Sequence, residues 1–189
     1  MTVRRAGIAI SVGCLAAALA LSILTPSEEL TQSPYIRTIP AENVAVDSRE
    51  VTVTMTGARL ADRVQTPDWT GVTDGVWLVV DLQFERRSDT GGIKGAFRIG
   101  DTDYALSQRA DTASLDQAGF GAPGLPVAGS VLVELPAAAL DDPAATHAVI
   151  QFSANSDPQL DGALEYTLDL TSLDHEHSFT LNDPQQVSP

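Results

Sequence analysis

The feature that most constrains the fold is a hydrophobic period of two, which recurs in short stretches from residue 50 onward. Successive side chains of a β-strand point to opposite faces, so this period is typical of strands. In the clearest stretch, 76–84, apolar residues occupy one face throughout, and Trp77 and Val79 make the other face apolar near its start. Apolar residues on both faces indicate a central strand that is covered on both sides.

Further stretches of this kind predict the remaining strands of the domain. They lie at 50–56 with a continuation over 58–64 past a bulge or turn at Gly57, at 96–99 and 103–107 as a hairpin, and at 130–135, 147–152, 164–171 and 175–181. After residue 24, no stretch of a dozen residues has a clean helical period. We therefore expect an all-β fold, an antiparallel immunoglobulin-like β-sandwich of about seven to nine strands over residues 49–182.

The start of the chain predicts where this domain is found. Arg4 and Arg5 precede residues 6–24, which carry no charge. A transmembrane helix needs roughly 17–25 apolar residues, and arginines on one side hold that end in the cytoplasm. We expect a cytoplasmic stub at 1–5, a single-pass transmembrane signal anchor at 6–24, and a C-terminal domain outside the cell membrane.

Two alternatives remain open for the same segment. Small residues at 18–20 and 20–22 offer sites for cleavage of a signal peptide, which would make the protein secreted. The Gly13-Cys14 pair offers a site for lipid modification. All three interpretations place the domain outside the cytoplasmic membrane.

Composition excludes several classes of function. The formal net charge is -14 and the pI is about 4.3, so binding to nucleic acid by charge is disfavoured. Cys14 is the only cysteine, which leaves the exported domain without disulfides or thiol chemistry. Residues 25–48 hold three prolines and predict an extracytoplasmic stalk, either free along its length or with its last part packed on the domain, and residues 183–189 predict a disordered tail.

Several strand motifs resemble a known bacterial group. The sequence GVWLVVDL at 75–82 is followed by a hairpin from Gly100 to Tyr104, by GSVLVELP at 129–136 and by LDL at 168–170. Together they resemble the telokin-like, immunoglobulin-like exported domains of unknown function (the DUF4352-like group), of an actinobacterial membrane-anchored type. Leu132 or Val133 stands where that group commonly has an aromatic residue. The resemblance implies an extracytoplasmic binding or accessory module with no catalytic residue set and no cofactor.

The three histidines are the candidate metal ligands. His175 and His177 are two apart, so on a strand they would share a face, and His147 could be a third ligand. The alternative is that all three are ordinary surface histidines. Acidic pairs at 101/103, 141/142 and 157/161 fit turn-forming aspartates better than a calcium loop.

Catalytic signals are weak, because the chain has no Gly-x-Ser-x-Gly elbow and few aromatic residues to line a sugar-cleaving cleft. We expect no enzymatic activity. Trp69, in the loop 67–74, is the candidate partner-binding residue, either as an exposed anchor or packed on the sandwich edge. The leading hypothesis is a non-enzymatic membrane-anchored interaction module with a protein partner, accessory to a membrane or transporter complex. The alternative is an exported small-ligand or metal-binding protein using Asp and His groups.

Overall fold

The computed structural model describes residues 13–15, 18, 21–22, 35–39 (backbone only), 43–156 and 162–188. The chain divides into two compact units, Met1–Ser33 and Pro34–Pro189. In the first unit the described residues are helical, and Cys14 is exposed. Most of the predicted anchor at 6–24, and all of the stub at 1–5, lie outside the described residues. Among the residues described, no helix is long and apolar enough to span a bilayer.

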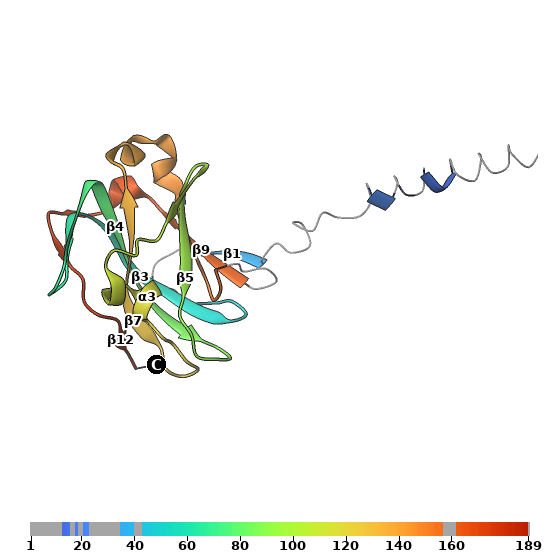
Figure 1. The fold of residues 1–189 in the computed structure, drawn as a ribbon, viewed down its shortest axis with the longest axis horizontal. Helices are drawn as coiled ribbons and strands as arrows, with labels where there is room; N and C mark the ends of the chain where they lie inside the picture. Colours follow the sequence, from blue (N-terminus) through green and yellow to red (C-terminus); the bar gives the residue numbers. More distant parts are fainter. Residues whose placement is uncertain are drawn as a thin grey trace, which may run out of the picture. The chain divides into compact units, whose positions relative to one another are not determined.

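The second unit is a two-sheet β-sandwich (Figure 1). A five-stranded sheet has the order β1-β9-β8-β5-β6, and a seven-stranded sheet is built on the path β10-β3-β4-β7-β12, with β2 and β11 also paired to β3. The strands are β1 (Tyr35–Ile39), β2 (Val46–Asp47), β3 (Val51–Gln65), β4 (Thr70–Arg86), β5 (Lys94–Ile99), β6 (Thr102–Ala105), β7 (Val127–Leu135), β8 (Ala148–Ser153), β9 (Gly162–Leu168), β10 (His175–Glu176), β11 (Phe179–Thr180) and β12 (Gln185–Gln186). The all-β sandwich expected from the alternation is confirmed.

Short helical segments occupy the connections between strands. They are η1 (Asp111–Ala113), α3 (Leu115–Ala118), η2 (Ala137–Asp141), η3 (Pro143–His147) and η4 (Leu170–Ser172). The first two interrupt the long crossing between β6 and β7, and η2 begins directly after Pro136, where the sequence predicts the end of a strand.

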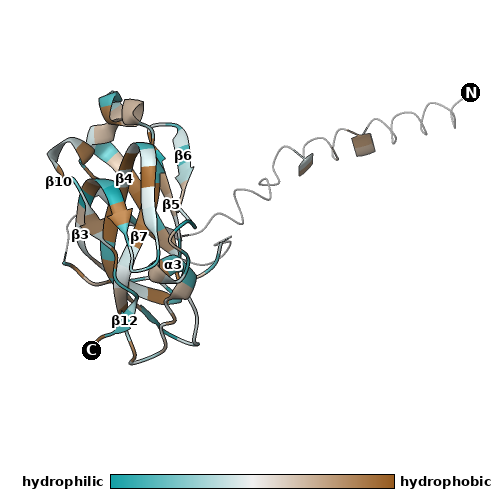
Figure 2. Ribbon diagram, turned by 60° about the vertical axis from the view of Figure 1, so that its left-hand side comes forward, coloured by the Kyte–Doolittle hydropathy of each residue, from teal (hydrophilic) through white to brown (hydrophobic). Residues whose placement is uncertain are grey.

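The main core lies between the two sheets. The inward face of β4 contributes Leu78, Val80, Leu82 and Phe84, which are all essentially unexposed. The five-stranded sheet faces them with its own buried residues, Phe97, Ile150, Phe152, Leu164 and Tyr166 among them. Apolar residues gather along β3, β4 and β7 (Figure 2). Trp77 and Val79 are also fully buried, but in a second cluster on the opposite face of β4, so β4 is the central strand covered on both sides that the sequence predicts.

Two register shifts shape the β3–β4 hairpin. The first, between Met55 and Gly57, is the irregularity expected at Gly57. At the second, Ala61 pairs with Trp77 but Arg63 pairs with Val72, so β4 has several extra residues there. Extra residues in one strand bend a hairpin, and the tip of this hairpin turns back beside the seven-stranded sheet (Figure 1).

The ends of the domain differ from the sequence expectations. Within the predicted stalk, Tyr35–Ile39 forms β1, which pairs in parallel with β9, and Val46–Asp47 forms β2 on β3. The predicted strand at 175–181 is two short strands, β10 and β11, which also run parallel to β3, so the sheets are not purely antiparallel. In the predicted disordered tail, Gln185–Gln186 pairs with β7 as β12. Exposed sheet edges carry unpaired backbone groups, and the chain ends supply partners for them.

Candidate functional site

The outer face of the seven-stranded sheet carries a second apolar cluster. Trp77, Val79 and Leu132 project from β4 and β7, and all three are unexposed. Segments from elsewhere in the chain complete the cluster with Ala61, Val64, Ala110, Ala113 and Leu181. An outward sheet face that is buried needs a cover, and here the cover comes from the hairpin tip, the η1 region and the C-terminal end of the chain.

Trp69 belongs to this cover. Its half-buried ring stands edge-on to that of Trp77, with 6.0 Å between ring centroids and planes at 85°. Gly71 makes this possible, since a Cβ there would lie 2.2 Å from the Trp69 ring. The guanidinium of Arg109 lies 5.6 Å from the Trp69 centroid and 5.3 Å from that of Trp77, and it forms a 2.9 Å ion pair with Glu134. Of the two alternatives for Trp69, the structure shows packing on the sheet.

The C-terminal strap, which we define as residues 175–187, also belongs to the cover. Its strands β10 and β11 pair with β3, and β12 pairs with β7. Leu181 is buried in the outer cluster and Phe179 packs against it. Arg59 of β3 contacts the strap at two points. Its guanidinium lies 5.0 Å from the Phe179 ring centroid, a cation–π contact, and 3.6 Å from the Glu176 carboxylate, an ion pair.

Arg59 is itself held by a carboxylate of the sheet. It forms an ion pair and hydrogen bond with Asp81 of β4, which also accepts a 2.5 Å hydrogen bond from the hydroxyl of Ser130 on β7. Both oxygens of the Asp81 carboxylate are therefore bonded, Oδ2 to Arg59 and Oδ1 to Ser130, so Asp81 holds the Arg59 side chain in place.

The histidines are divided between two places. His175 and His177 both contact Asp62, with Nε2 of His175 2.8 Å and Nδ1 of His177 3.1 Å from its two carboxylate oxygens. The hydrogen bond from His175, and then that from His177, lower the pKa of Asp62 from its ordinary value. His147 lies at the end of η3, where its Nδ1 is 2.7 Å from the Thr146 hydroxyl. The described residues contain no group of three or more His, Cys, Asp or Glu side chains placed to hold a metal ion.

Among the acidic pairs, one residue of the described part of the chain has a local structural role. Asp142 accepts a 2.8 Å hydrogen bond from the backbone of Ala144 and caps η3. Asp101 lies in the β5–β6 turn and Asp103 lies in β6, and both are exposed. The pair 157/161 lies outside the described residues.

Two hollows flank the strap. One has a volume of about 490 Å³ and extends over the outer face to Asp81 and Ser130. The other, of about 410 Å³, lies toward the hairpin tip at Gln65 and Pro67. Both are lined by the same strap residues, Asn182, Asp183 and Gln185. The strap therefore crosses the face without filling the space around it.

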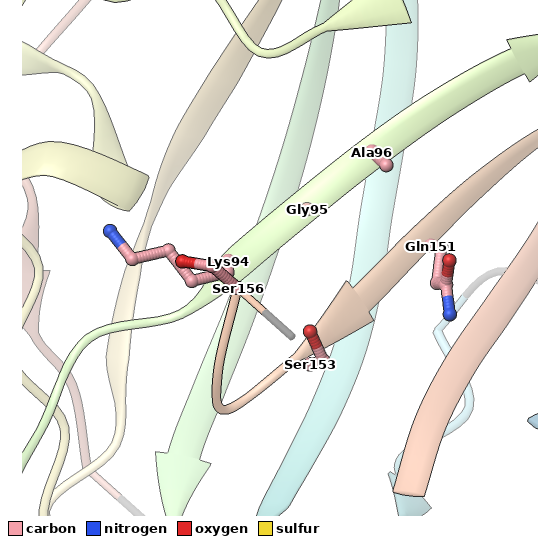
Figure 3. Close-up of a pocket in the computed structure, with 6 residues that line it drawn as sticks. All are labelled: Lys94, Gly95, Ala96, Gln151, Ser153 and Ser156. Carbon is pink, nitrogen blue, oxygen red and sulfur yellow. The ribbon is translucent and has the colours of Figure 1, made fainter. Parts of the chain in front are cut away.

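A smaller hollow of about 160 Å³ lies on the outer face of the five-stranded sheet (Figure 3). Lys94 pairs with Ser153 there, and Ala96 pairs with Gln151, so two small side chains leave room beside two longer ones. Lys94 is the only lysine of the chain. An ammonium and neutral polar groups can hold a small anion, and among the described residues the lining includes no carboxylate or imidazole to act as a base.

The loop 119–126 displays apolar side chains that the sequence reasoning did not single out. Phe120 is 62% exposed and Leu125 is 49% exposed. The signal in the sequence was available, since this glycine-rich run carries no charge in a strongly acidic chain. It was missed because single exposed apolar residues in a loop have no period.

The backbone of this loop is fixed by hydrogen bonds. Gly121 exchanges two 3.0 Å bonds with Gly91, and the Gly124 amide donates to the Glu85 carboxylate over 2.7 Å. Gly124 has φ of 73°, a conformation that favours glycine. The side chains of Phe120 and Leu125 therefore project from a backbone that hydrogen bonds hold in one conformation.

Comparison with known proteins shows the fold alone. No protein-family model matches the chain, and no curated protein matches it in sequence. It is similar in structure to an uncharacterised β-sandwich protein from Clostridium difficile 630, with a TM-score of 0.51 and 8% identity over 76% of this chain and 99% of that one. A "putative lipoprotein" from Bacillus subtilis gives a TM-score of 0.47 and 13% identity over 70% of this chain, which spans 40% of that protein.

Proposed function

We propose that the protein is a non-enzymatic, membrane-anchored extracytoplasmic interaction module that binds a protein partner through the loop 119–126. The observation that carries this proposal is the display of Phe120 and Leu125 on a hydrogen-bonded loop. Interfaces are dominated by a few apolar anchors, and an anchor that is already positioned loses less conformational freedom on binding.

A hollow beside the loop strengthens the case. It has a volume of about 180 Å³ and lies between Pro126, at the end of the loop, and Ala45, next to β2. The adjacent residues Leu125 and Val44 are 49% and 46% exposed. An apolar side chain of a partner could enter this hollow while the exposed residues contact its rim, which is the arrangement of an interface hot spot.

The chemistry of the loop favours protein over other partners. The loop carries no charge, and the chain as a whole has a formal net charge of -14. Nucleic acids and anionic lipid surfaces attract basic patches and would be repelled by this chain.

The uncharged segment 6–24, preceded by Arg4 and Arg5, supports the extracytoplasmic placement. The strand motifs that resemble DUF4352-like exported domains support an accessory role in a membrane or transporter complex. The loop would then face partners outside the cell membrane.

Site-specific photocrosslinking tests the proposal in intact membranes. With p-benzoylphenylalanine at position 120, we expect a crosslinked product containing a distinct second protein. The matched control carries the same group at Val72, which is 56% exposed but lies on the hairpin. Equal products from both positions, or none from position 120, would refute the loop as the contact site.

A further inference from the structure

The C-terminal strap is bound to the rest of the domain as a separate peptide would be. Its backbone extends the sheet at both edges, through β10 and β11 on β3 and through β12 on β7. Additional backbone bonds join Leu181 N–H to Gln65 C=O over 2.7 Å and Val187 N–H to Pro126 C=O over 3.0 Å. Addition of an extended segment to a sheet edge is a recurring mode of peptide recognition, in which backbone bonds supply affinity.

Alternate side chains of the strap enter the outer face. Phe179 and Leu181 are two apart, as strand geometry requires for side chains on one face. Leu181 is only 1% exposed, and Arg59 lies over the ring of Phe179. In strand addition, pockets for alternate side chains supply specificity. In this structure the face therefore holds an aromatic residue and an aliphatic residue with one residue between them.

The strap fits its groove incompletely. Its three strands contribute only six register pairs in total, two each. Surface hollows of about 490 Å³ and 410 Å³, both open to solvent, are lined by Asn182 and Asp183. A segment that is held by few register pairs and borders open hollows leaves room for a segment that makes more contacts.

We propose that the outer face of the seven-stranded sheet is a peptide-binding groove, occupied in this structure by the chain's own strap. Its external ligand is an extended segment of a partner protein that carries an aromatic-x-aliphatic pattern, pairs with β3 and β7, and displaces the strap. This groove adjoins the loop 119–126 at Pro126 but does not include Phe120 or Leu125, and the inference does not depend on the function proposed for that loop.

The partner segment must compete with the strap, which is covalently attached to the domain. A strap on a short tether has an effective concentration in the millimolar range. A peptide with the same contacts therefore binds the intact protein weakly, and it binds well only where the strap is disabled or where the peptide also fills the hollows.

A binding experiment on the full chain tests this inference. The variant carries Phe179→Ser and Leu181→Ser, which remove the two inserted side chains and change no residue of β3, β4 or β7. The probe is a fluorescein-labelled peptide of residues 174–188, followed by fluorescence anisotropy. We expect saturable binding to the variant, and binding at least about tenfold weaker to the wild-type chain, because the attached strap competes.

The matched control is the same peptide with serine at both positions, which should not bind. Phe120→Ser in the loop should leave peptide binding unchanged, so that a failure of the loop proposal and a failure of this one are distinguishable. Absence of peptide binding to the folded variant, or equal binding of the control peptide, would overturn the groove. A wild-type dimer that the double substitution abolishes would identify a second copy's strap as the occupant and overturn a separate partner.

Hydrogen exchange on the wild-type chain provides a test that needs no variant. If the strap opens locally, the amides of Leu181 and Val187 exchange faster than the amides in the centre of β4. If they exchange only with global unfolding, the groove never becomes vacant and the inference is wrong.

Discussion

Tyr166 joins the two sheets through its hydroxyl group. The ring belongs to β9, but the hydroxyl donates to the Val53 carbonyl over 2.9 Å and accepts from the Met55 amide over 3.3 Å, both in β3. Loss of one partner from a buried bond costs about 1–3 kcal/mol. We expect Tyr166→Phe to lower the free energy of unfolding by about that amount in urea denaturation.

Tyr104→Phe is the matched control for this substitution. Tyr104 is half-buried against Phe97, with 6.3 Å between ring centroids, and its change should leave stability nearly unaltered. A loss from Tyr104→Phe as large as that from Tyr166→Phe would show that the hydroxyl bonds to β3 are not responsible.

The same tyrosine predicts an alkaline effect. Burial raises the pKa of Tyr166 from 10.0 to about 12. A group whose folded pKa is raised contributes stability that is present below its unfolded pKa and is lost as pH rises toward the folded value. Ultraviolet titration should therefore show one tyrosine ionising near pH 12, and stability should decline from about pH 10 upward. Tyr166→Phe should remove that part of the decline, and an unchanged decline would contradict the assignment.

Asp62 is the acidic counterpart, with a pKa lowered first by His175 and then by His177. A lowered folded pKa contributes stability above the ordinary value of 3.8, which is lost as pH falls through the folded value. We expect the double substitution His175→Ala and His177→Ala to raise the Asp62 pKa toward 3.8, as measured by carboxyl NMR titration. Asp169, whose pKa is lowered mainly by Thr171, should not move. A shift of both carboxylates would indicate a general change of the fold.

At the scale of elements, the folded-back β3–β4 hairpin depends on one close approach. Gly71 lies under the Trp69 ring, where an added Cβ would come within 2.2 Å of it. Gly71→Ala should displace Trp69 from Trp77, change the tryptophan fluorescence, and destabilise the domain by about 1–3 kcal/mol. Gly57→Ala is the control, since its Cβ would meet Arg59 and Asp81 at 3.6 and 3.7 Å, an ordinary contact. If the two substitutions have equal effects, the ring contact is not the cause.

At the scale of the whole molecule, sequence periodicity predicted the features of the fold that have a local pattern of alternating apolar and polar residues. The sandwich, the central strand with Trp77 on its second covered face, and the irregularity at Gly57 all have local signals. The pairings of β1, β10 and β12 have none, because strands of two to five residues show too little of a period and their position depends on where a distant sheet edge is open.

In the candidate site, too, residues could be identified from the sequence, but the contacts between them depend on the fold. His175 and His177 meet at Asp62, a residue that only the register of β3 brings to them. Trp69 could be identified from composition, but its contact with Trp77 follows from the shift between Ala61 and Arg63. Phe120 could be identified as a candidate contact residue only from the exposure of its side chain in the structure.

Closure of the sheet edges by both ends of the chain has a consequence for the order of events during synthesis. β1 is synthesised early, but its partner β9 follows much later in the sequence. In the same way β3 and β7 are synthesised before β10, β11 and β12, which pair with them. Pairings between distant segments form slowly, and a nascent chain cannot complete them before both segments have emerged. The sheet edges therefore acquire these strands only after residues 162–186 have been synthesised.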